Sequence, residues 1–144
     1  MNSRTVARTL RHADGAATIF ADLEFPLGAL ASLDGAPVGS LDSVRVTVTP
    51  DAGTYGITVS PDGLVFATGA RPTVTLSYVR YGDLSAGLVS PRYPDALSYA
   101  AALDIWHEAG VDRWAVAPGS GGTGGDAVTA RLSTGGRYVA AAPR

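Results

Sequence analysis

The chain has 144 residues, 46% of them hydrophobic, which is enough for one globular domain with a core of its own. Its net charge of -2 creates no strong field, so neither nucleic acid nor a membrane is expected as a partner. Cysteine and lysine are both absent, which excludes disulfides, thiolate metal sites, Schiff-base lysines and the lysine of phosphate-binding loops.

The N-terminal segment is basic, because Arg4, Arg8 and Arg11 precede the first strong strand pattern. Chain termini are poorly ordered unless something ties them down, so a solvated terminus is the simpler interpretation. The alternative is an arm that docks on a neighbouring molecule. We therefore expect an N-terminal basic arm over residues 1–15, followed by a single β-sandwich domain over residues 16–144.

Most of the remaining chain has strand patterns. In residues 44–49 valines alternate with polar residues, and in residues 72–79 β-branched and aromatic residues dominate. Residues 26–43 are rich in Gly, Ala, Asp and Pro and are predicted to form a long excursion, which either folds over the sandwich or reaches outward. The predicted strands are residues 17–25, 44–49, 55–60, 64–66, 72–79, 102–108, 113–117, 127–132 and 137–141.

Residues 94–110 carry two conflicting patterns. An early proline and an alanine cluster favour a helix, whereas Leu103 and Ile105 alternate with polar and aromatic neighbours as in a hairpin strand. We assign a short helix near residues 94–100 and a strand over residues 102–108. The predicted fold class is all-β, a β-sandwich of about nine mostly antiparallel strands with this one helix.

Four segments of the chain together resemble a known domain family. They are Phe25 to Leu30, Ser60 to Phe66, Pro72 to Tyr78, and a Trp-containing hairpin with Val128 to Val139. On these segments the chain resembles a divergent bacterial ZU-five domain, the β-sandwich module of ankyrins and netrin receptors. The resemblance covers roughly residues 17–142 and implies a structural or interaction module.

The self-cleavage motif of some ZU-five relatives is missing. These relatives cut themselves at a His-Phe-Ser tripeptide before the last strand, where the serine attacks its own preceding carbonyl. Here Thr134, Gly135 and Gly136 stand at the matching positions. Because neither the serine nor the histidine is present there, self-cleavage is not expected.

Other candidate chemistry is weak. Residues 119–124 match the G-x-G-x-x-G pattern, but a predicted strand follows them where a phosphate-binding helix is required, which favours a hairpin loop. His12 and His107 are too few for a three-histidine metal site, and we interpret His107 as a hydrogen-bonded edge or core residue. Asp22 and Glu24 are predicted to lie on a solvated face. We expect no enzyme activity, cofactor, metal or small-molecule ligand.

The residues that suggest a function are surface residues. Tyr81 and Tyr93 stand in Gly- and Pro-rich segments and are expected to be exposed, where tyrosines suit protein contacts. With Arg4, Arg8 and Arg11 they form the predicted interface, and a protein partner or self-association is expected.

These features favour two functional hypotheses over a third, a hydrolase or lectin-like binder, which needs a pocket that the sequence does not indicate. The first is a non-catalytic structural or protein-interaction module of a larger bacterial protein, extracellular or at the cell surface if that protein is exported. The second is a stand-alone subunit of a large assembly, such as a bacteriophage capsid decoration or tail accessory protein, with the virion as its location.

Overall fold

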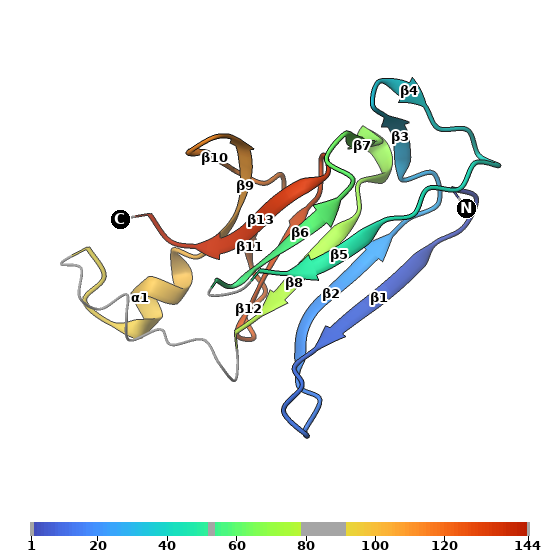
Figure 1. Ribbon diagram of the computed structural model, residues 1–144. Helices are drawn as coiled ribbons and strands as arrows, with labels where there is room; N and C mark the ends of the chain where they lie inside the picture. Colours follow the sequence, from blue (N-terminus) through green and yellow to red (C-terminus); the bar gives the residue numbers. More distant parts are fainter. Residues whose placement is uncertain (1, 52–53, 79–91, 144) are drawn as a thin grey trace.

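A computed structural model describes residues 2–51, 54–78 and 92–143. Its fold is all-β, as predicted: the described residues form 13 short antiparallel strands in three open sheets, with one α-helix (Figure 1). That helix, α1 (Ala96–Ala101), begins at Asp95, whose carboxylate accepts a hydrogen bond from the backbone N–H of Ser98. Within the described ranges, no helix is long and apolar enough to cross a membrane.

The first large sheet has the strand order β1-β2-β8-β12-β11. Leu23, Val74 and Ala130 lie opposite one another on β2, β8 and β12 and are buried, so this face of the sheet is the inner one. The strands are β1 (Val6–Arg11), β2 (Ile19–Phe25), β8 (Thr73–Ser77), β12 (Ala127–Arg131) and β11 (Gly121–Gly122).

The second large sheet has the strand order β10-β9-β13-β6-β5. Tyr138 of β13 lies between Ile57 of β6 and His107 of β9, and both Tyr138 and Ile57 are completely buried. The strands are β10 (Arg113–Val116), β9 (Asp104–Gly110), β13 (Gly136–Ala141), β6 (Gly56–Ser60) and β5 (Thr47–Pro50).

A small third sheet, with the order β4-β3-β7, lies at one end of the two large ones (Figure 1). An antiparallel bridge between Val65 and Thr134 joins it to the segment between β12 and β13. Its strands are β3 (Leu30–Leu33), β4 (Ala36–Pro37) and β7 (Leu64–Phe66), and the short 3-10 helix η1 (Thr68–Ala70) follows β7.

One hydrophobic core joins the sheets. Side chains from both large sheets and from β7 belong to the same buried cluster, because period-two alternation gives each strand one apolar face. The largest fully buried members are Ile57, Val59, Leu64, Val74, Leu76, Ile105, Val128, Leu132 and Tyr138.

The nine predicted strands are all present, with ends displaced by a few residues, and the helix lies within two residues of its predicted position. The glycine loop forms the hairpin of β11 and β12, as expected. The excursion over residues 26–43 contains two short paired strands, β3 and β4, which were not among the predicted strands. These strands are short and pair through a turn at Asp34 and Gly35, both in left-handed conformations, so period-two alternation is too brief to be visible.

The N-terminal segment differs from the expected arm. Residues 6–11 form β1, which pairs along its whole length with β2, so this part belongs to the first sheet. Val6 and Leu10 are half-buried while the residues between them are exposed. Two apolar residues separated by four positions suffice for an edge strand, although they are too few to give a strong pattern in the sequence.

Candidate functional site

The two large sheets leave a cleft between one edge of each. β1 ends the order of the first sheet and β5 ends the order of the second, and in Figure 1 both run along the same side of the molecule. The hollow between them has a volume of about 460 Å³. We call it the β1–β5 cleft.

The floor of the β1–β5 cleft is apolar. Leu10 and Leu23 line it from the first sheet, Val48 lines it from β5, and Val46 lines it from the segment just before β5. These side chains pack against the core, and only Leu23 is fully buried. The cleft is therefore an opening onto the hydrophobic core, and burying its floor would release water from apolar surface.

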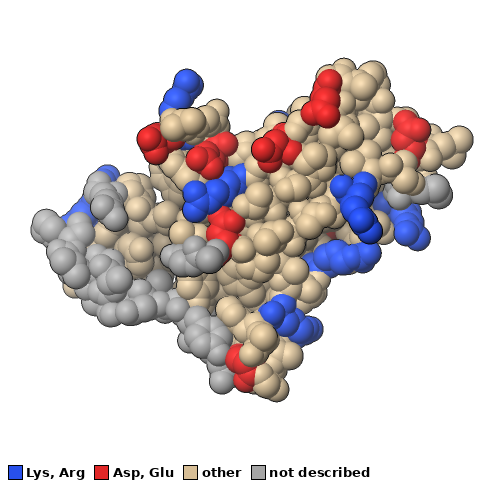
Figure 2. Space-filling view, viewed as in Figure 1, with Lys and Arg blue, Asp and Glu red and all other residues tan. Residues whose placement is uncertain are grey.

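Three arginines surround this apolar floor. Arg4, Arg8 and Arg45 line the cleft, and all three are exposed. No carboxylate lines the cleft, and none within the described part of the chain forms an ion pair with these arginines. Figure 2 shows basic side chains along the side of the molecule that β1 and β5 form. The cleft thus combines an apolar floor with an uncompensated positive rim.

The register of β1 points Arg8 toward the cleft. Arg8 lies directly opposite Leu23, which lies opposite Val74, and both partners are buried. Directly opposed residues share a face, so Arg8 extends from the inner face of the sheet at its open edge. Its Nη1 donates to the carbonyl of Ala7 (2.8 Å).

Asn2 closes one end of the cleft. Its side chain donates to the carbonyl of Leu30 and accepts from the N–H of Leu30, both at 2.9 Å. Its backbone N–H donates to Asp42 and its carbonyl accepts from Gly28. Asn2 is 9% exposed and is the one buried polar residue of the described segments. The chain start is therefore tied to β3, which fixes the entry of β1.

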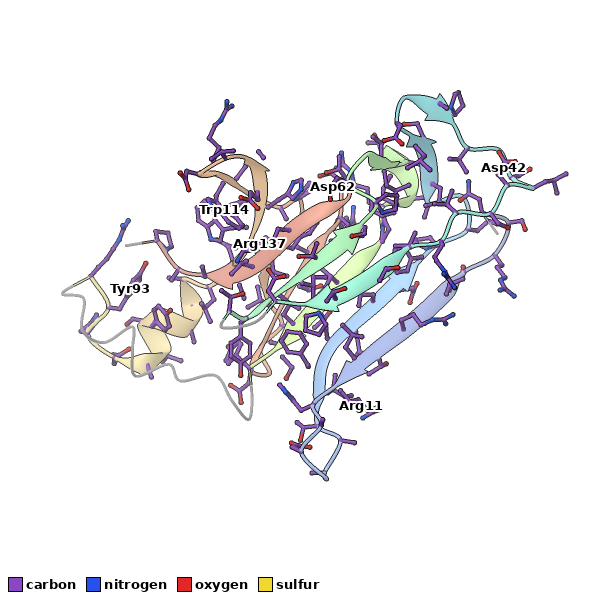
Figure 3. The ribbon with its side chains drawn as sticks, viewed as in Figure 1. Arg11, Asp42, Asp62, Tyr93, Trp114 and Arg137 are labelled. Carbon is purple, nitrogen blue, oxygen red and sulfur yellow. The ribbon has the colours of Figure 1, made fainter. Side chains whose placement is uncertain are left out.

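The remaining residues of the predicted interface lie elsewhere. Arg11 is at the far end of β1, where Nη1 donates to the carbonyl of Ala17. The prediction that Tyr93 is exposed was wrong: it is 7% exposed, packs on Tyr99 and donates to the carbonyl of Pro143. Arg11 and Tyr93 are well separated (Figure 3). Tyr81 lies outside the described residues.

A second surface cluster joins Trp114, Arg137 and Asp51. The guanidinium of Arg137 lies over the ring of Trp114, 5.5 Å from its centroid (Figure 3). Nε of Arg137 lies 2.6 Å from a carboxylate oxygen of Asp51. This hydrogen bond raises the pKa of Arg137. Because Asp51 already compensates this charge, the cluster offers no free cation to a partner.

The side chain of His107 lies close to the hydroxyl of Thr134, a contact that was not predicted from the sequence. Its Nε2 lies 3.3 Å from both Thr134 Oγ1 and the carbonyl oxygen of Gly135, and Thr134 Oγ1 itself donates to that carbonyl (2.9 Å). A carbonyl can only accept, so Nε2 carries the hydrogen and is a donor here. Burial lowers the pKa of His107. This geometry holds a turn and does not activate Thr134.

The predicted carboxylate pair is part of a polar face. Asp22 accepts a hydrogen bond from Thr9 Oγ1 (2.6 Å) across β1 and β2, and Glu24 is exposed. Among the described residues, no three His, Cys, Asp or Glu side chains are grouped as a metal site would require.

No family model, curated protein or solved structure matches this chain. The resemblance to ZU-five domains therefore stays a prediction, and the β1–β5 cleft must be interpreted from its own chemistry.

Proposed function

We propose that this domain is a non-catalytic protein-binding module and that the β1–β5 cleft receives its partner. The observation that carries the proposal is the combination of an apolar floor with the three arginines Arg4, Arg8 and Arg45. No acidic residue lines the cleft, and none in the described segments forms an ion pair with these arginines. Such a surface is complementary to a segment that has both apolar and acidic side chains.

A protein segment suits this cleft better than other partners do. Phosphate backbones would satisfy the arginines but leave the apolar floor in water. A purely apolar ligand would leave the positive rim without a partner. A peptide chain can place apolar side chains on the floor and carboxylates at the rim, because its side chains alternate.

Two settings for such a module follow from the sequence. The resemblance to ZU-five domains supports a module of a larger bacterial protein, which joins or supports other parts of that protein. The edge strands β11 and β10, at the other ends of the two large sheets, support the second candidate, a subunit of a larger assembly such as a capsid decoration or tail protein, since edge strands allow pairing between copies. Light scattering separates them: the first predicts a monomer, and the second predicts a discrete oligomer.

Selection from a random peptide library tests the proposal. The immobilised domain is the bait, and the triple variant Arg4→Glu, Arg8→Glu and Arg45→Glu is the counter-selection. All three positions are exposed, so the variant should unfold at nearly the same urea concentration as the wild type. We expect peptides rich in Asp, Glu and aliphatic residues that bind only the wild type. Equal enrichment on both baits would contradict the proposal.

A further inference from the structure

We infer that the partner enters the β1–β5 cleft as an additional β-strand on the free edge of β1, with an acidic residue opposite Arg8 and an apolar residue two positions to either side. This inference rests on the proposed function. It adds the mode of recognition and the chemical pattern of the partner segment.

The choice of β1 over β5 follows from backbone chemistry. β1 has six residues, none of them proline, and its outer edge has no neighbouring strand among the described residues. β5 has four residues and ends at Pro50, which has no N–H to donate. A strand added to β1 would therefore find more backbone donors and acceptors.

The pattern of the partner follows from the inner face of β1. Val6, Arg8 and Leu10 share this face and line the cleft. A strand paired with β1 places one residue opposite each of them, and alternate residues face the cleft. The expected cleft-facing pattern is apolar, acidic, apolar at every second position. The pattern is the same in both directions, so parallel and antiparallel entry both satisfy it.

An inward-facing arginine on an edge strand also has a simpler role, because such charges prevent edge-to-edge aggregation. That role requires only one charge. It does not require a hollow of about 460 Å³ that opens onto the core, nor the two further arginines Arg4 and Arg45 around it. Arg8 can instead select among strands, because it repels a basic residue, loses hydration without gaining a partner opposite an apolar residue, and pairs with an acidic one.

The occupant is a segment of another protein rather than a second copy of this chain. Within the sequence the required spacing occurs only at Tyr93, Asp95 and Leu97 and at Ala102, Asp104 and Trp106. Asp95 caps helix α1, and Asp104 lies on β9, which already has β10 and β13 as neighbours. Neither segment is free to pair with β1 of another copy while the fold is intact.

Binding of two matched peptides to two proteins tests the inference. The first peptide has the core Val-Thr-Glu-Thr-Val, and the second replaces Glu by Lys. Wild type should prefer the Glu peptide by about tenfold, and Arg8→Glu should reverse the preference. Arg113→Glu on β10, also an exposed arginine, is the control and should leave the preference unchanged. The isomer Val-Glu-Thr-Thr-Val, which turns Glu to the other face, should bind weakly.

Amide hydrogen exchange identifies the strand that receives the peptide. On adding the Glu peptide, exchange should slow in β1 and stay unchanged in β5. Protection of β5, or a preference that Arg8→Glu does not alter, would overturn the inference but leave the cleft as a binding site. Failure of both peptides to bind would also overturn it. The proposed function itself would be overturned by a different result, a library selection that yields no peptide dependent on the three cleft arginines.

Discussion

The imidazole of His107 lies flat against the phenol ring of Tyr138, with the ring centroids 4.3 Å apart and the planes within 8° of parallel. The two residues are opposite each other on β9 and β13. Tyr138 Oη donates to the carbonyl of Thr134, and His107 Nε2 contacts Thr134 and Gly135. The pair therefore fixes the turn between β12 and β13, which the third sheet also contacts.

Removing the hydroxyl in Tyr138→Phe should destabilise the fold. This oxygen donates to Thr134 O (2.8 Å) and accepts from the N–H groups of Ser133 (3.2 Å) and Thr134 (3.3 Å). Their loss in a fully buried site costs about 1–3 kcal/mol of the free energy of unfolding. Urea denaturation measures the change, and an unchanged midpoint would show that water replaces the hydroxyl.

Stability should depend on pH through His107. Its folded pKa is lowered from 6.5, mainly by burial, against the opposing effects of the Gly135 carbonyl and Glu108. The unfolded chain therefore binds the proton more readily, and stability is lost as the pH falls through 6.5 toward the lower folded pKa. Between pH 7.5 and 5.5, wild type should lose more stability than His107→Gln. Parallel losses in the two proteins would exclude this residue as the cause.

Asn2→Ala should weaken the attachment of the N-terminal segment to β3. The substitution leaves the N–H and carbonyl of Leu30 without their side-chain partner, which costs roughly 1–3 kcal/mol. We expect faster amide exchange at Leu30 and along β1, with the second sheet much less affected. Uniform acceleration across all strands would instead mean that β1 and the core unfold together.

Gly135→Ala should be poorly tolerated because there is no space for a side chain. A Cβ at this position would lie 2.1 Å from the carbonyl oxygen of Pro61, a backbone atom that cannot rotate away. We expect a loss of about 1–3 kcal/mol in urea denaturation. Gly122→Ala is the control, since a Cβ there meets nothing within 4 Å. Equal stability of the two variants would contradict the packing argument.

The fold was predictable where apolar and polar residues alternate over the length of a whole strand. Residues 55–60 and 127–132 alternate over a whole strand and bury one face each, so the pattern and the structure agree. Short strands such as β4 and β11 depend on their neighbours for hydrogen bonds and carry no pattern of their own. Whether such a short segment forms a strand depends on its pairing with other strands in the folded protein, and local propensity cannot predict that pairing.

The candidate site was predictable in part. Arg4 and Arg8 are in the predicted interface, and both line the cleft. Arg45 was not included, because it comes close to them only when β5 folds beside β1. The alternation of Val6, Arg8 and Leu10 was the available signal for β1, and its basic composition favoured an arm instead. Composition alone does not show that Tyr93 is covered by the C-terminal segment.

Mapping a bound peptide by NMR tests most directly whether the β1–β5 cleft is the partner-binding surface. The strongest peptide from the library selection is titrated into isotopically labelled domain. We expect changes in backbone chemical shift to concentrate in β1, in residues 44–48 and at Leu30, while the indole signals of Trp106 and Trp114 stay unchanged. Shifts centred on Trp114 and Arg137, with β1 unchanged, would contradict it.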